Sequence, residues 1–158
     1  MEEAIIPDLD RIDLAILRAL QADGRITNAD LAQKVNLSAA TCHRRTQRLQ
    51  EAGVIGGVRA LVTPEHVGLG ALVMVGVVLD RSTPDSFAAF EAAVTRMKVV
   101  LECSLVAGDF DYLLKVRVGD MKDFNRLHAE QLIALPGVRQ IRTFFVIREV
   151  KRDGLLPF

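Results

Sequence analysis

The hydrophobic periodicity of the chain changes once, near residues 64–70, and this change constrains the fold more than any other feature. Before it, apolar residues recur at helical spacing; after it, apolar runs of strand length alternate with helical segments. Pro64, Gly68 and Gly70 lie at the change, which is typical of a boundary. The 158 residues therefore predict a small helical part followed by a mixed one.

Three short helices are predicted in the first part. Residues 10–21 place their apolar side chains on one helical face, and aspartates near the start suit the positive end of the helix dipole. Thr27 is the expected N-cap of a second helix that continues through Val35. Ser38 is the expected N-cap of a third helix, which Gly53 is suited to end.

The third helix is strongly basic, although the chain has a formal net charge of zero. At about 100° per residue its apolar side chains, Cys42 among them, gather on one face and its cations gather on the other. Two helices joined by a tight turn, the second one basic, form the helix-turn-helix pattern. The alternative is a solvated amphipathic helix with ordinary surface arginines.

Residues 55–70 contain two short β-type runs that Gly56 and Gly57 separate. This pattern predicts a small two-stranded wing or a linker. The predicted domains are therefore residues 1–54 for the helix-turn-helix, 55–70 for the β linker or wing, and 71–158 for the second domain.

The second part has the order strand, helix, strand, strand, helix, strand. The predicted strands are residues 71–79, 99–107, 112–118 and 138–150. Thr83 and Asp120 are the expected helix caps, and the second helix should turn these residues inward: Met121, Phe124, Leu127, Leu132 and Leu135. The predicted fold class is thus α+β, an N-terminal winged helix-turn-helix followed by a ferredoxin-like βαββαβ domain. Its uncovered sheet face predicts a homodimer at least.

Composition and motifs argue against several functional classes. No apolar run approaches the ~20 residues that span a bilayer, and the acidic start MEEAIIPDLD differs from a secretory signal, so we expect a cytoplasmic protein. Cys42 and Cys103 form no CxxC pair, and the histidines have no ligand spacing, so we expect no metal or cofactor. Both cysteines are predicted to be core residues. No catalytic motif is present, so we expect no enzyme.

Three segments carry a family resemblance: LDRIDLAILRALQADGRIT, LSAATCHRRTQRLQEAGVI and LVAGDFDYLLKVRV. From about Leu9 to Lys151 the chain resembles the Lrp/AsnC regulators, the feast/famine transcription factors. It has alanine at position 39, where the family typically has proline. The resemblance implies a transcriptional regulator that binds double-stranded DNA, responds to an amino acid, and assembles from homodimers into an octamer or a similar ring.

The basic helix is the predicted DNA-reading element. The N-terminal residues of a recognition helix approach base edges, while longer cations reach phosphates. A small side chain permits close approach, a threonine can contact a base, and an arginine can bind guanine with two hydrogen bonds. The predicted DNA-binding residues are Ser38, Ala40, Thr41, His43, Arg44, Arg45 and Arg48.

The segment LVAGDFDY is the predicted effector loop. An amino-acid site needs an anionic acceptor for the ammonium group, backbone donors and apolar walls, and this segment supplies those residue types. The family resemblance adds Thr143 from a neighbouring protomer and favours leucine or methionine as the effector. The predicted effector-binding residues are Leu105, Gly108, Asp109, Asp111, Tyr112 and Thr143. Residue types alone favour a plain hairpin turn, which is compatible with a site.

Two other functions are consistent with parts of the pattern. An architectural protein would wrap DNA with weak sequence choice and a steep salt dependence. A small ferredoxin-like enzyme would need a paired acid and base, for which Asp109 and Asp111 are the candidates.

Overall fold

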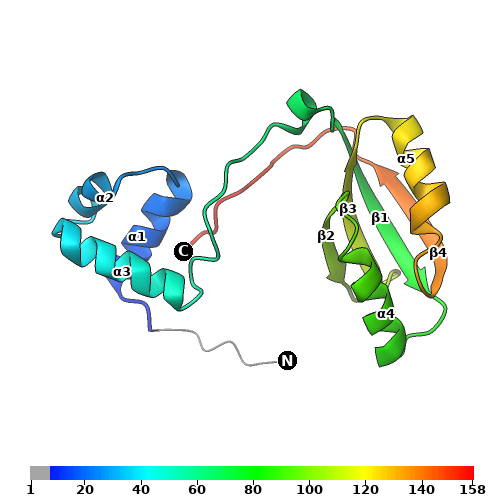
Figure 1. Ribbon diagram of the computed structural model, residues 1–158, viewed down its shortest axis with the longest axis horizontal. Helices are drawn as coiled ribbons and strands as arrows, with labels where there is room; N and C mark the ends of the chain where they lie inside the picture. The colour runs from blue at the N-terminus through cyan, green and yellow to red at the C-terminus, as the bar shows by residue number, and fades with distance from the viewer. Residues whose placement is uncertain (1–7) are drawn as a thin grey trace. The chain divides into compact units, whose positions relative to one another are not determined.

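The computed structural model describes residues 8–158, so the acidic Glu2 and Glu3 of the N-terminus lie outside the described residues. The chain forms two compact units (Figure 1). A helical unit contains the chain up to Leu61 together with Lys151–Phe158, and a sheet unit contains Val62–Val150. The C-terminal segment, which we predicted as part of the second domain, thus groups with the helices, because its last residues bond to the first helix.

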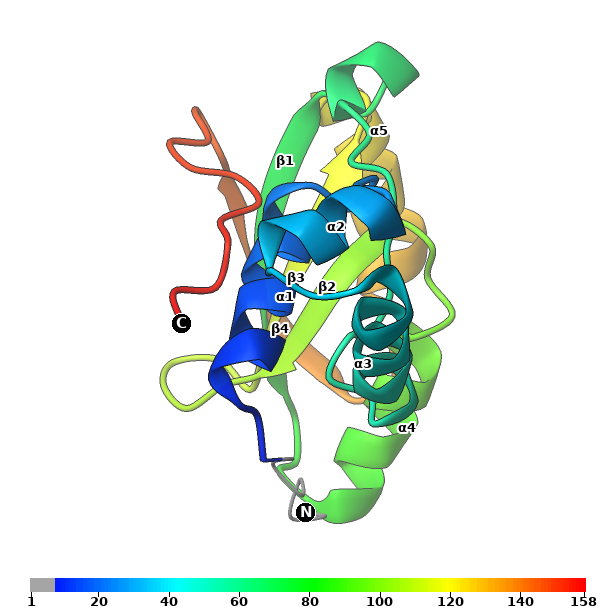
Figure 2. The same cartoon turned by 90° about the vertical axis from the view of Figure 1, so that its left-hand side faces the viewer.

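The helical unit consists of α1 (Arg11–Ala22), α2 (Asn28–Lys34) and α3 (Ala39–Glu51), which gather into one bundle (Figure 2). Each helix begins at a side chain that accepts backbone N–H bonds, and Thr27 and Ser38 confirm the two predicted caps. Asp10 caps α1 in a reciprocal capping box with Asp13. Gly53 ends the third helix region with a φ of 71°.

The core of the helical unit is small and apolar. It consists of Ile16, Ala19, Leu31, Ala32, Cys42 and Leu49. Cys42 has no exposed surface, which confirms its predicted position on the buried face of the basic helix. All three helices contribute to this core, so each is held against the others by burial of an apolar face.

Residues 56–63, all of them described, form no strand, so of the two predicted alternatives, a two-stranded wing or a linker, this segment has the form of a linker. Val58, Leu61 and Val62 project with more than half of their surface exposed. A strand needs a hydrogen-bonded neighbour, and this segment has none among the described residues. The segment leads into a short 3₁₀ helix, Pro64–Val67.

The sheet unit confirms the predicted ferredoxin-like order. Four antiparallel strands lie in the order β2-β3-β1-β4. The strands are β1 (Ala71–Leu79), β2 (Val100–Leu105), β3 (Tyr112–Val118) and β4 (Val138–Phe145). The helices α4 (Pro84–Val94) and α5 (Met121–Leu127), with a π-helical turn at His128–Leu132, share one core with one face of the sheet.

Three details of the sheet unit differ from the prediction. The last strand ends at Phe145 instead of residue 150, because Phe145 pairs with Val73 and β1 begins only two residues before that. Met121, predicted to face inward, is 53% exposed at the first position of α5. Cys103, predicted to be core, is exposed on the edge strand β2. No described helix is long and apolar enough to cross a membrane.

Candidate nucleic-acid interface and effector loop

The start of α3 is an exposed, well-capped helix terminus. The Ser38 hydroxyl accepts the Thr41 N–H at 3.3 Å and donates to the Thr41 hydroxyl at 2.9 Å. Ala40, His43 and Arg44 are exposed, whereas the opposite face is buried through Cys42 and Leu49. The structure therefore brings the N-terminal predicted DNA-binding residues together on one accessible surface.

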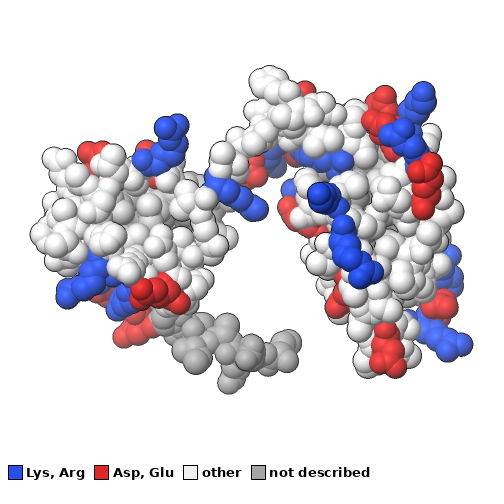
Figure 3. Space-filling view, in the orientation of Figure 1, with Lys and Arg blue, Asp and Glu red and all other residues white. Residues whose placement is uncertain are grey.

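Two arginines of α3 are held by α1 instead of projecting freely. Arg45 Nη1 lies 2.7 Å from Asp10 Oδ2 and 2.9 Å from Asp13 Oδ1. Arg48 Nη2 bonds to the other oxygen of Asp13, which is only 1% exposed. Both cations therefore bridge α3 to α1, and their positive charge is partly compensated. Figure 3 shows basic and acidic side chains side by side on the surface of this unit.

The pKa of Asp10, the carboxylate that caps α1, reflects these contacts. The backbone N–H of Asp13, and then the guanidinium of Arg45, lower the pKa of Asp10 below its ordinary 3.8. Sequence reasoning considered the aspartates of α1 only for the helix dipole and missed this bridge. The partners are separated by 32 to 35 positions along the chain, so no local pattern connects them.

Arg44 differs from its neighbours on the helix. It is exposed and makes no hydrogen bond or ion pair with any residue between 8 and 158. Arg45, by contrast, has a side chain only 26% exposed, and Arg48 is 56% exposed but bonded to Asp13. Among the three arginines, Arg44 is therefore the one with no donor engaged by a residue between 8 and 158.

The predicted effector loop is a hydrogen-bonded turn between β2 and β3. Asp111 Oδ2 accepts the Leu79 N–H at 2.8 Å, the Asp111 N–H donates to Val77 O at 2.9 Å, and Asp111 O accepts the Val106 N–H at 2.9 Å. Gly108 has a φ of 145°, a conformation that favours glycine. These bonds give Asp111 a role in the fold that the sequence did not reveal.

The other predicted effector residues fall in different surroundings. Leu105 is 57% exposed and Asp109 is exposed on the same turn as Gly108. Tyr112 is 1% exposed, so it cannot line an open wall of a site in the single chain. Its hydroxyl donates to Glu91 Oε1 at 2.6 Å, and burial followed by this bond raises its pKa above the ordinary 10. Thr143 lies on β4 opposite Val75.

An aromatic cluster covers part of the sheet face away from the helices. Phe110, from the effector loop, lies against Gly76 of β1, where a Cβ atom would come within 2.6 Å of its ring. The Arg142 guanidinium lies 5.9 Å from the centre of the Phe110 ring, and the Phe144 ring lies 6.0 Å away, edge to face. The loop is thus attached to the open face by a contact that requires glycine at position 76.

Comparisons with known proteins cover nearly the whole chain. Residues 72–156 match the family described as Lrp/AsnC ligand binding domain, and residues 9–55 match the family described as winged helix-turn-helix DNA-binding. The leucine-responsive regulatory protein of Salmonella typhimurium is 48% identical over 149 residues, which cover 94% of this chain and 91% of the relative. The protein of that name in Escherichia coli K12 is 47% identical with the same coverage.

Solved structures agree with these relatives. A transcriptional regulator of Neisseria meningitidis in complex with L-methionine is 36% identical, with a TM-score of 0.89, and the match covers 95% of this chain and 97% of that one. A feast or famine regulatory protein of Mycobacterium tuberculosis complexed with L-methionine is 31% identical, with a TM-score of 0.86 and coverage of 94% and 99%.

Proposed function

The chain belongs to the Lrp/AsnC family of regulators, and from this premise we propose that it is a cytoplasmic, sequence-specific DNA-binding transcriptional regulator whose activity or assembly responds to leucine or methionine. The observation that supports DNA reading most directly is the capped, exposed start of α3, where Arg44 has no partner among residues 8–158. Double-stranded DNA, a small amino acid and further copies of the chain are the proposed partners.

The residues of α3 take different parts in this proposal. Ala40 and Thr41, in the first turn of α3, would meet base edges, and Arg44 would bind guanine with two hydrogen bonds. Ser38 and His43 flank this surface toward the phosphates. Arg45 and Arg48 contact phosphate only with the part of their donors that the aspartates of α1 leave available.

The effector site is proposed at the turn between β2 and β3. Gly108 and Asp109 offer exposed backbone and an exposed carboxylate, and Leu105 offers an apolar contact. Asp111 Oδ2 accepts the Leu79 N–H at 2.8 Å and Oδ1 accepts only the long bond of 3.5 Å from the Ser82 hydroxyl, so Asp111 would receive an ammonium group mainly through Oδ1. Thr143 would be supplied by a neighbouring protomer, and Tyr112 would support the site from the core.

Assembly of the homodimer, and then of an octamer or similar ring, would cover the sheet face away from the helices. Phe144 on that face is 49% exposed, opposite Met74 of β1. Exposed apolar surface of this kind is typical of a face that a second copy covers. The architectural alternative differs in having little sequence discrimination, and the enzyme alternative is less favoured because one oxygen of Asp111 is bound to the backbone.

An affinity comparison of two arginine variants tests the proposal. Arg44→Ala should cost ~1–3 kcal/mol on the specific operator and relax sequence choice at one position of each half-site. Arg96→Ala removes the same charge from an exposed position of the sheet unit and should leave binding unchanged. Titrations on specific and random duplexes at several salt concentrations measure both. Equal affinity of Arg44→Ala and the parent for every duplex would contradict the proposed recognition helix.

A further inference from the structure

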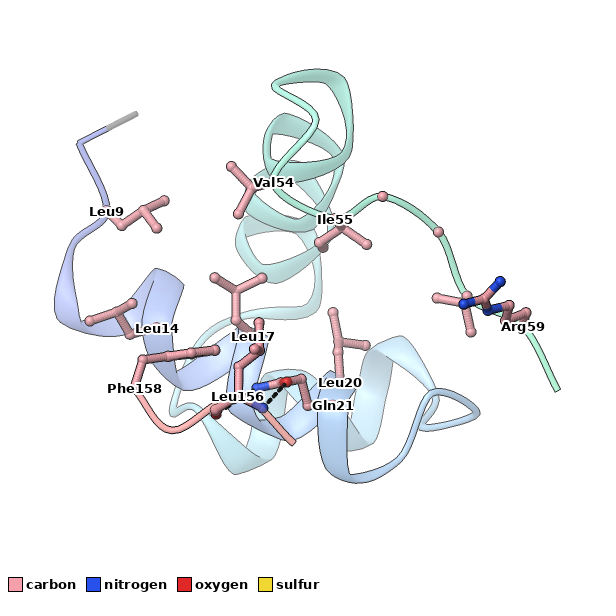
Figure 4. Close-up of a pocket in the computed structure, with 13 residues that line it drawn as sticks. Leu9, Leu14, Leu17, Leu20, Gln21, Val54, Ile55, Arg59, Leu156 and Phe158 are labelled. Atoms are coloured by element: carbon pink, nitrogen blue, oxygen red, sulfur yellow. Dashed lines mark hydrogen bonds between the residues drawn. The ribbon is translucent and has the colours of Figure 1, made fainter. Parts of the chain in front are cut away.

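The C-terminal segment docks on α1 through hydrogen bonds between its main chain and side chains of α1. The Leu156 N–H donates to Gln21 Oε1 at 2.9 Å, and Gln21 Nε2 donates back to Leu156 O at 3.4 Å. Arg18 Nε donates to the main-chain oxygen of Phe158, and its guanidinium lies 5.6 Å from the centre of the Phe158 ring. Figure 4 shows Leu156 and Phe158 beside α1, with the Gln21 bond drawn. Two side chains of α1 therefore hold the segment at two points.

An apolar groove of about 740 Å³ within the helical unit lies beside the docked segment, and Leu156 and Phe158 form part of its lining. Leu14, Leu17 and Leu20 of α1 line it together with residues 54–59. The segment is only partly buried there, since Phe158 remains 41% exposed and Leu156 70% exposed. Leu156 buries little apolar area, Phe158 buries more, and the exposed hydrogen bonds of Gln21 and Arg18 each contribute modestly, so no single contact dominates the attachment.

The other end of the segment is anchored in the sheet unit. The Val146 N–H donates to Leu72 O at 3.0 Å, directly after β4. Glu149 then forms an ion pair with Arg117, which is only 5% exposed. Arg117 Nη1 also donates to Leu69 O at 3.4 Å, in the segment that enters β1. The buried Arg117 thus bonds to both chain segments that connect the sheet unit with the helical unit.

We propose that residues 151–158 are a releasable strap through which the sheet unit acts on the DNA-reading helix. The strap starts where β4 and Arg117 hold it and ends on Gln21 and Arg18 of α1. The same helix holds α3 through the bonds of Asp13 to Arg45 and Arg48. A change at β4 can therefore reach α3 along bonded contacts. The consequence for DNA binding rests on the proposed function, whereas the docking does not.

A tryptophan reporter tests the docking in the full chain. The sequence contains no tryptophan, so Phe158→Trp gives a single emission signal on the strap. Gln21→Ala in this background removes both bonds to Leu156 and keeps a good helix former on α1. Because the Phe158 ring is 41% exposed when docked, release should raise collisional quenching by acrylamide roughly twofold. Gln33→Ala on the exposed surface of α2 is the matched control and should leave quenching unchanged.

DNA titrations of the chains without the reporter test the coupling. With L-leucine or L-methionine as the added probe, Gln21→Ala should shrink the effector-dependent ratio of dissociation constants toward one, while Gln33→Ala keeps the parent ratio. Equal quenching in the two glutamine variants would overturn the strap. If Gln21→Ala increases quenching but leaves the effector-dependent ratio of dissociation constants at the parent value, the role of the strap in coupling would be overturned. A parent chain that binds no DNA would overturn the proposed function, and the quenching comparison would still decide whether the strap docks.

Discussion

The carboxylate of Asp13 is the point where α1 and α3 are joined, and replacing it tests how the recognition helix is held. Asp13→Asn keeps the size of the side chain and an oxygen that can accept from an arginine, but removes the negative charge. In the parent, Asp13 Oδ1 accepts from Arg45 at 2.9 Å, Asp13 Oδ2 bonds to Arg48, and the side chain is 1% exposed. The variant therefore leaves two cations facing a neutral partner.

The expected cost follows from this burial. Removing one partner of a fully buried ion pair typically costs about 3–5 kcal/mol. Here the arginines keep 26% and 56% of their side-chain exposure, so both regain part of their hydration. The remaining amide bonds reduce the cost further, to about 2 kcal/mol. For a domain of this size, that loss lowers the melting temperature by roughly 10 °C.

Thermal unfolding followed by far-ultraviolet circular dichroism measures the effect on the helical unit. Asp8→Asn is the matched control, because it removes the same charge from an exposed carboxylate just before α1. It should melt like the parent. If both asparagine variants melt within about 2 °C of each other, the joint between α1 and α3 contributes no stability and the reasoning from burial is refuted.

Three further outcomes are expected. Gly76→Ala should destabilise the sheet unit by about 1–3 kcal/mol in urea unfolding, because its Cβ meets the Phe110 ring. In a chain that already carries Phe110→Ala, Gly76→Ala should cause no such loss of stability. Asp111→Asn, which can still accept the Leu79 N–H, should weaken effector binding by roughly ten- to a hundredfold in calorimetric titration, and equal affinity would exclude this carboxylate. Because the pKa of Asp10 is lower in the folded chain than its ordinary value of 3.8, its carboxylate stabilises the fold at pH values above 3.8. This stabilisation is lost as the pH falls through the pKa of Asp10 in the folded chain. Asp10→Asn should therefore make the melting temperature depend less on pH in the acid range.

Local sequence signals predicted the elements of this fold well. Thr27, Ser38, Thr83 and Asp120 cap the helices that were expected to follow them, because a cap bonds to a backbone N–H only three residues away. The strand order was also predictable, since the alternation of strands and helices leaves few allowed connections. The buried face of α3, with Cys42, follows from helical periodicity alone.

Features that depend on distant partners were not predictable from one sequence. The bridge of Asp13 to Arg45 and Arg48 spans 32 to 35 positions, so a pattern within one helix shows only an outward cation. The bond from Leu79 to Asp111 likewise joins two strands through a side chain that reads as a simple turn residue. Residues 56–63 have strand-like composition but no strand neighbour among residues 8–158, so composition alone could not decide between the predicted wing and linker.

The discontinuous helical unit has a consequence for synthesis of the chain. Residues 151–158 emerge from the ribosome after the whole sheet unit, yet their partners Arg18 and Gln21 lie 135 to 140 positions earlier. The nascent helices can form their own core, but Leu156 and Phe158 can line the groove beside α1 only after the sheet unit has been translated. The helical unit is thus built from parts made before and after the sheet unit, and its assembly requires both to be present.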